Sequence, residues 1–139
     1  MDETLTIVPL QFEKVVQSRT YSCIVLASDE KKFGIFSLPE TGKAMQRYLT
    51  ESQKERPLTH DLLHAVFRGL DMKVKQIVIV DLQDTVYYAR LFLEQKLTDR
   101  INIIEIDARP SDCVTLALIY KSPIYCTRDV LEKAIPYCD

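Results

Sequence analysis

The chain has 139 residues, of which 47% are hydrophobic and 27% charged, a mixture typical of a globular domain large enough to bury its own core. Its formal net charge of −2 provides no overall positive field, which argues against a simple electrostatic clamp for DNA or RNA. Only 3 glycines and 6 prolines are present, too few for long flexible linkers, so we expect one compact domain over residues 1–139.

The first third of the chain predicts three strands and a helix. Apolar residues over 4–16 predict a long or bulged strand, in which Pro9 favours an edge position or a bulge because proline cannot donate to a ladder. Residues 20–27 and 33–38 predict two more strands, joined by a polar turn at 28–32. Pro39 begins a helix that extends to about Thr50, and the charged run at 51–55 is typical of exposed surface.

The middle third predicts a helix followed by three strands. The helix runs from His60 to about Leu70, with Thr59 as its N-cap. Its apolar residues have helical spacing and are expected to face the core: Leu62, Leu63, Val66, Phe67 and Leu70. Strands are expected over 74–82, 86–93 and 101–106. Adjacent strand residues point to opposite faces, so one of Tyr87 and Tyr88 should lie in the core.

The last third predicts a helix from Pro110 to about Tyr120, a short strand at 124–126 and a C-terminal helix capped by Thr127. The first of these helices is apolar on almost every side, so it should be the most buried. This order of elements predicts an α+β fold with about four helices and a largely antiparallel or mixed sheet.

Several function classes are disfavoured by the same sequence. The four cysteines form no Cys-x-x-Cys pair and only two histidines are present, which argues against a zinc site or a redox dithiol. No glycine-rich loop follows a strand, so neither a dinucleotide fold nor a phosphate-binding loop is supported. The N-terminus has no signal-peptide pattern and no apolar run approaches the roughly 20 residues needed to span a bilayer. We therefore expect a cytoplasmic protein without a membrane segment.

A polar cluster stands at the junction of the 101–106 strand and the helix that follows it. Its sequence is Asp107-Ala108-Arg109-Pro110-Ser111-Asp112. Proline is favoured at the first helical position, which places Ser111 and Asp112 in the first turn beside free backbone N–H groups. Proteins with helices packed on a sheet tend to place sites at such strand ends. The same residue types also serve as ordinary helix caps and ion pairs, so spacing alone leaves both interpretations open.

Three blocks together resemble the bifunctional nuclease domain family. They are Arg56-Pro57-Leu58-Thr59-His60-Asp61-Leu62-Leu63, the strand region from Val80 to Leu91, and Ile106-Asp107-Ala108-Arg109-Pro110-Ser111-Asp112 with its downstream Pro123-Ile124-Tyr125. The resemblance runs from about Val8 to Ala134. It implies a single domain, a homodimer, and nuclease activity on DNA and RNA. The chain departs from the family pattern over residues 36–44, where members usually carry a Trp-Ile-Gly segment and a Glu-Ala helix start.

The polar blocks suggest a phosphodiester hydrolase. In this hypothesis His60 is the general base, Asp107 and Asp112 hold Mg²⁺ or Mn²⁺, and Asp61 is a possible third ligand. Four more residues would contact the nucleic acid: Arg56, Thr59, Arg109 and Ser111. The second histidine, His64, is expected to face solvent. The alternative is a non-enzymatic dimeric regulatory or interaction module in which these residues cap helices and form a buried ion-pair network.

The basic residues that could touch nucleic acid are scattered among acids and predict no dedicated binding face. They are Lys31, Lys32, Lys43, Arg47, Lys54, Arg56, Lys73 and Lys75.

Overall fold

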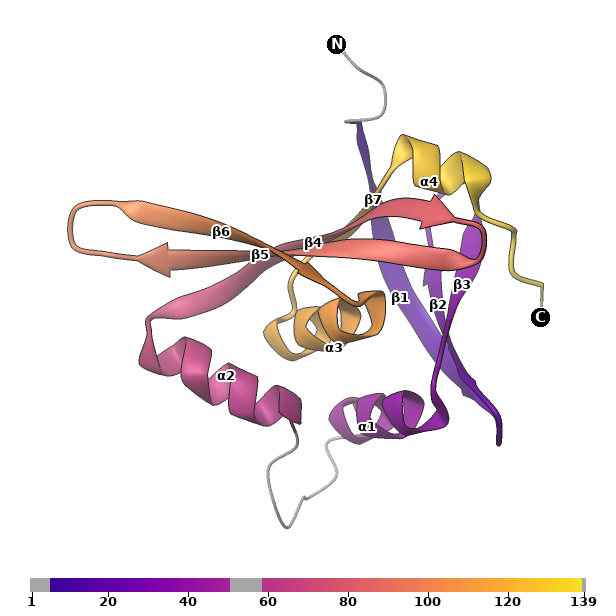
Figure 1. Ribbon diagram of the computed structural model, residues 1–139, viewed down its shortest axis with the longest axis horizontal. Coiled ribbons are helices and arrows are strands. Elements are labelled where there is room, and N and C mark those ends of the chain that lie inside the picture. Colours follow the sequence, from indigo (N-terminus) through magenta and orange to yellow (C-terminus); the bar gives the residue numbers. More distant parts are fainter. Residues whose placement is uncertain (1–5, 51–58, 139) are drawn as a thin grey trace.

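Seven strands form one mixed sheet in the order β3-β2-β1-β7-β4-β5-β6 (Figure 1). The computed structural model describes residues 6–50 and 59–138. The strands are β1 (Ile7–Gln17), β2 (Ser22–Ala27), β3 (Lys32–Ser37), β4 (Met72–Gln83), β5 (Val86–Lys96), β6 (Ile101–Ala108) and β7 (Ile124–Thr127). The helices are α1 (Pro39–Leu49), α2 (Thr59–Gly69), α3 (Pro110–Tyr120) and α4 (Arg128–Lys133). Neighbouring strands are antiparallel except β4 and β7, which are parallel. The expected α+β fold with a mixed sheet and four helices is confirmed.

Strand β1 changes partners along its length, which explains its proline. Residues Ile7–Leu10 pair with β7, whereas pairing with β2 begins at Gln11 and contains an irregularity between Phe12 and Lys14. Pro9 therefore lies where β1 has a neighbour on one side only, and its missing N–H costs no ladder bond. The expected bulge and the local edge position are both present.

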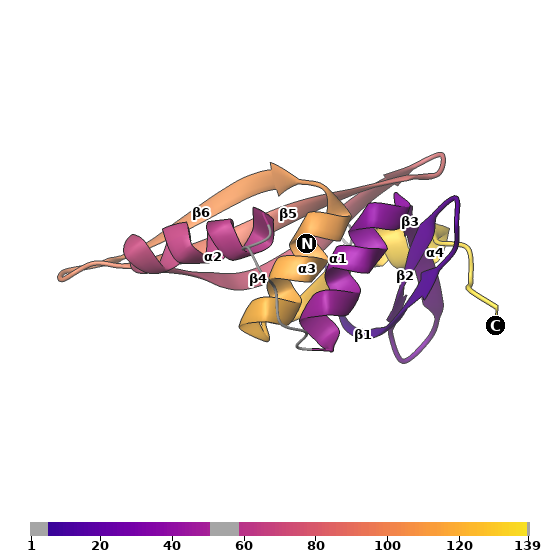
Figure 2. The same ribbon diagram turned by 90° about the horizontal axis from the view of Figure 1, so that it is seen from below.

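Three helices cover one face of the sheet and α4 covers the other (Figure 1). Seen from below, α3 lies between α1 and α2 (Figure 2). Helix α3 is the most buried, as its composition predicted, since every residue from Cys113 to Ala117 is buried. Close packing of α1 on the sheet depends on Gly42, because a Cβ there would lie 2.5 Å from the Cβ of Ser22. The expectation for the tyrosine pair is confirmed, since Tyr87 stacks on buried Phe33 at 5.5 Å and Tyr88 is exposed.

Helix α2 is turned differently from the prediction. Leu63 and Phe67 pack inward, but three members of the expected core stripe are exposed: Leu62, Val66 and Leu70. The prediction that His64 faces solvent is also wrong, since its ring contacts Tyr120 at 4.8 Å. The inward side of α2 carries His60, Leu63 and His64, and both histidines contact residues of α1 or α3. Part of the apolar stripe of α2 is therefore left exposed to solvent.

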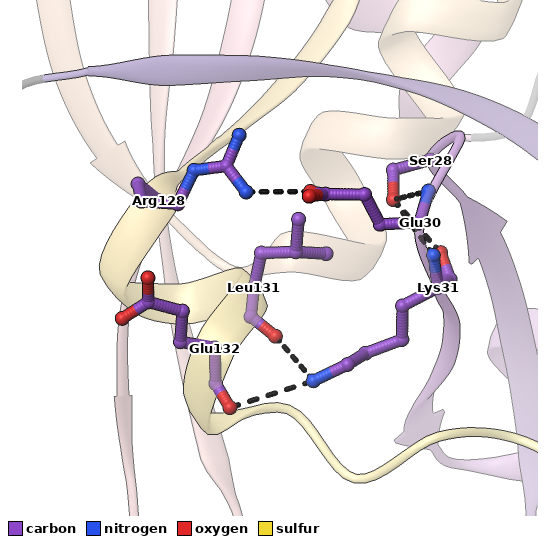
Figure 3. Close-up of polar contacts among 6 residues, drawn as sticks. All are labelled: Ser28, Glu30, Lys31, Arg128, Leu131 and Glu132. Carbon is purple, nitrogen blue, oxygen red and sulfur yellow. Dashed lines mark hydrogen bonds and ion pairs between the residues drawn. The ribbon is translucent and has the colours of Figure 1, made fainter.

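The C-terminal segment is fixed to the β2–β3 hairpin by a lysine (Figure 3). The Nζ of Lys31 donates to the carbonyl oxygens of Leu131 and Ala134, at 2.6 and 2.8 Å. Close by, Nη1 of Arg128 lies 2.5 Å from an oxygen of Glu30. A cation at the carbonyl end of a helix is stabilising, and here it satisfies acceptors that α4 cannot use itself. The expected cap of α4 is also present, since the Thr127 hydroxyl accepts from the Val130 N–H at 3.2 Å.

The four cysteines are free thiols in the structure. Cys23, Cys113 and Cys126 are buried and Cys138 is exposed, and all four are free. Burial raises the pKa of Cys126 to about 11. Within residues 6–50 and 59–138, no helix combines the length and apolar character needed to cross a bilayer.

Candidate functional site

The two polar blocks meet between the N-termini of α2 and α3. The Nε2 of His60, in the first turn of α2, lies 3.0 Å from Oδ1 of Asp112, in the first turn of α3. Arg109, the N-cap residue of α3, donates to the same carboxylate from Nε at 2.8 Å and from Nη2 at 3.2 Å. His60 and Asp112 are 52 positions apart in the chain, so this contact brings the α2 block and the α3 block together, a question that the sequence had left open.

Asp112 is a carboxylate held in its charged form. The hydrogen bond from His60, and then the hydrogen bonds and positive charge of Arg109, lower its pKa to about 2, although partial burial opposes this. Only 14% of the His60 side chain and 28% of the Asp112 side chain are exposed, whereas 67% of the Arg109 side chain faces solvent. The trio therefore has a sheltered half, made by histidine and aspartate, and an exposed guanidinium.

Asp107 lies near this trio but is not part of it. It is exposed at the end of β6, opposite Arg90 of β5 in the register. The pKa of the Cys113 thiol is raised to about 12. Burial makes the largest contribution, followed by the negative charge of Asp112 and then that of Asp107. The charges of both carboxylates thus act on the same buried thiol.

These donors do not fit a divalent cation as they are arranged. Both oxygens of Asp112 already accept hydrogen bonds, from His60 and Arg109. Mg²⁺ requires oxygen ligands in near-octahedral geometry. In the described part of the chain, no group of three or more His, Cys, Asp or Glu side chains could hold a metal ion. Binding of Mg²⁺ or Mn²⁺ at Asp107 and Asp112 would require Asp112 to release a partner, and it stays a prediction.

The other residues of the α2 block have different surroundings. Thr59 is exposed and is the first described residue of α2, so its expected role as the N-cap stays a prediction. Asp61 lies beside Tyr48 of α1, and burial together with the negative charge of Asp61 raises the pKa of Tyr48 to about 12. The Tyr48 ring also meets the His60 ring edge-on, with centroids 6.1 Å apart. Arg56 lies outside the described residues. Sequence reasoning missed Tyr48, because an aromatic residue on an amphipathic helix resembles core packing.

Among the described residues of the predicted site, Ser111 is the buried one. It is 4% exposed, and its hydroxyl makes no hydrogen bond within the described part of the chain. It lines a hollow of about 250 Å³ together with Arg109, Pro110, Phe36 of β3 and the β4–β5 turn. The side chain of the N-cap residue, Arg109, accepts no hydrogen bond from the first turn of α3. The backbone N–H groups of that turn are therefore left for other acceptors. The hollow therefore presents a hydroxyl, a helix N-terminus and a guanidinium.

Three of the basic residues named above have partners within the protein. Lys31 is occupied by the carbonyls of the C-terminal segment, and Lys32 pairs with Glu13 at 3.2 Å. Lys73 pairs with Glu94 at 3.5 Å.

Comparison with known proteins identifies the family of the chain. The family model of the bifunctional nuclease domain matches residues 24–137, which include most of β2, all elements from β3 to α4 and both polar blocks. The chain belongs to the bifunctional nuclease domain family. The match begins within β2 and so includes the whole His60–Asp112–Arg109 trio.

Two relatives of this bifunctional nuclease domain are uncharacterized proteins from two strains of Mycobacterium tuberculosis. Each is 40% identical to the chain over 79 residues, which is 57% of this chain and 44% of the relative. The chain thus spans less than half the length of these relatives.

Proposed function

We propose that the domain is a nuclease of relaxed sequence specificity that hydrolyses phosphodiester bonds in DNA and RNA. One observation carries the proposal: the Nε2 of His60 lies 3.0 Å from Asp112, which joins the two blocks that the family resemblance singled out. Membership of the bifunctional nuclease domain family supports it.

Each member of the trio has a role in this reaction. Asp112 binds the Nε2 side of the imidazole and fixes its orientation, which leaves Nδ1 to accept the proton of the attacking water. The Asp112 carboxylate also stabilises the imidazolium that forms. Arg109 is anchored by Asp112 and largely exposed, so it can meet the phosphoryl oxygens. Thr59, Ser111 and Arg56 are the proposed further contacts to the nucleic acid, and Asp61 positions Tyr48 against the His60 ring.

The test is cleavage of labelled single-stranded RNA and DNA by the purified domain. His60→Ala and Asp112→Asn should each lower the rate by at least roughly 100-fold, the scale for loss of a general base or of the group that orients it. His64→Ala is the matched control, because it removes the other histidine of α2 and should leave cleavage within a few-fold of the parent. Circular dichroism of each variant confirms folding. If His60→Ala and His64→Ala cleave equally well, the proposed site is wrong.

A chelator distinguishes a nuclease that needs a divalent cation from one that does not. Cleavage that persists in EDTA would mean that the trio acts without a cation. Loss of cleavage in EDTA, restored by Mg²⁺ or Mn²⁺ and weakened in Asp107→Asn, would support a cation bound by Asp107 and Asp112.

A second candidate function, a non-enzymatic dimeric module, is favoured by exposed apolar side chains on α2 and on the edge strand β6. Val66 on α2 and Ile103 on β6 are 47% and 49% exposed, and β6 is the last strand of the sheet. An open, apolar edge strand can pair with the same strand of a second copy about a two-fold axis. Ile103→Lys should then convert a dimer into a monomer in light-scattering chromatography, whereas Leu38→Lys, at an exposed leucine after β3, should not. A parent protein that is monomeric would eliminate this candidate.

A further inference from the structure

Two hollows lie side by side near the N-terminus of α3, and they differ in chemistry. The first is the polar hollow already described, with Ser111 and Arg109. The second, of about 310 Å³, is apolar and lies between β3, the β4–β5 turn and the C-terminal segment. Both are lined by Phe36, Thr85 and Tyr87, so these three side chains form a common wall.

The polar hollow is suited to a phosphate. The N–H groups and dipole of an uncapped helix N-terminus attract anions, and Arg109 adds a positive charge. Ser111 is the independent observation that points to a ligand, since the residue is only 4% exposed, lines the hollow and has a hydroxyl that makes no hydrogen bond within the described residues. Asp112 does not line this hollow, because its carboxylate is directed to His60 and Arg109.

The apolar hollow is suited to a flat ring. Phe36 and Tyr137 line it, as does Ile135, which is 79% exposed. Polar groups also line it, those of Asp84, Thr85 and Lys133, and they could meet the edge of a base. Aromatic platforms of this kind stack bases with little sequence preference.

The aromatic walls are held in place by further contacts. Tyr87 stacks on Phe33 at 5.5 Å, and Phe36 packs edge-on against Tyr21 at 5.4 Å. The Nζ of Lys14 lies 5.5 Å from the centre of the Tyr137 ring. Rings that are already fixed lose little freedom when a ligand binds.

We propose that the two hollows form a subsite for one nucleotide of a single-stranded nucleic acid. The phosphate binds at Ser111, Arg109 and the α3 N-terminus, and the base stacks in the apolar hollow beside Phe36. This inference rests on the proposed nuclease function, for which it supplies the substrate class: strands whose bases are free to leave the stack. Base-paired duplex would not fit, because its bases cannot enter the hollow.

The experiment is titration of the ¹⁵N-labelled domain with AMP, adenosine and inorganic phosphate, followed by NMR. AMP should shift the amide signals of Ser111 and of Phe36 and bind more tightly than adenosine or phosphate. Phosphate alone should shift the Ser111 region, and adenosine alone the Phe36 region. Ser111→Ala and Phe36→Ala should each weaken AMP roughly tenfold, the scale for loss of one hydrogen bond to a charged group or of one base stack. Tyr88→Ala removes an exposed ring of β5 outside both hollows and should leave AMP binding unchanged.

The outcomes separate this inference from the proposed nuclease. AMP binding that both variants leave unaltered, or AMP shifts away from both hollows, would overturn the subsite even if the domain cleaves RNA through His60. Binding that depends on Ser111 and Phe36 in a domain that cleaves nothing would support the subsite and remove the nuclease. If Phe36→Ala unfolds, Phe36→Leu serves instead, since it keeps the apolar volume and loses the stacking face.

Discussion

Replacing Asp112 by asparagine should destabilise the domain at neutral pH and leave it almost unaffected in acid. The ordinary pKa of an aspartate is about 3.9, whereas that of Asp112 is about 2. Each unit of difference between the folded and unfolded states is worth about 1.4 kcal/mol, so the charged carboxylate contributes between about 2 and 3 kcal/mol at pH 7. Because the folded pKa is the lower one, this contribution is present above the unfolded pKa and is lost as the pH falls from about 5 to 2.

The assay is urea unfolding of the parent and Asp112→Asn at a series of pH values. The gap between their free energies of unfolding should be largest at pH 6 to 7 and should shrink steadily below about pH 4. Asp129→Asn is the matched control, because Asp129 also lies in the first turn of a helix and pairs with a lysine, Lys133, at 3.0 Å. That pair is exposed, so the control should cost at most about 1 kcal/mol. A gap for Asp112→Asn that stays constant from pH 7 to 3 would refute the reasoning.

Three further predictions concern packing and access. Gly42→Ala should lower the free energy of unfolding by about 1–3 kcal/mol, because the new Cβ overpacks α1 on the sheet. Gly69→Ala places no atom within 4 Å of the new Cβ, so it should be neutral or stabilising by up to about 1 kcal/mol. Equal melting temperatures of the two variants would contradict this prediction. Lys31→Met should lower the free energy of unfolding by about 1.5–3 kcal/mol, because it removes the hydrogen bonds to the carbonyls of Leu131 and Ala134. Lys32→Met removes a surface ion pair and should lower it by less than about 1 kcal/mol in the same urea assay. A larger loss for Lys32→Met than for Lys31→Met would contradict this prediction. In the folded protein a thiol reagent should modify Cys138 alone, with the buried thiols reacting only in denaturant; rapid reaction of more than one thiol would show that the core opens.

The sequence predicted the elements well, because most carry strong local signals. Pro110 at a first helical position and Thr127 at a cap left little freedom for α3 and α4. The orientation of α2 was not predictable in this way. Its apolar residues occupy a wide stripe, and which part faces inward depends on the partners that α1 and α3 provide for His60 and His64.

The candidate site was predicted in part. The pairing of His60 with Asp112 could be expected only from the family resemblance, since nothing in the spacing of two helix starts 52 residues apart fixes their distance. The contribution of Tyr137 to a hollow was not foreseeable, because it depends on how Lys31 holds the C-terminal segment.

The position of β7 has a consequence for how the chain acquires its structure. This four-residue strand lies in the middle of the sheet, between β1 and β4, although it is the last strand in the sequence. Val8 pairs with Cys126, so the central ladder joins segments more than a hundred residues apart. During synthesis β1–β3 and β4–β6 can form two separate hairpin units, each with an exposed inner edge, until β7 leaves the ribosome and joins them. Non-local pairing of this kind slows folding and exposes edges to aggregation. We therefore expect substitutions in Ile124–Thr127 to reduce the yield of folded protein in cells more than their effect on equilibrium stability would indicate.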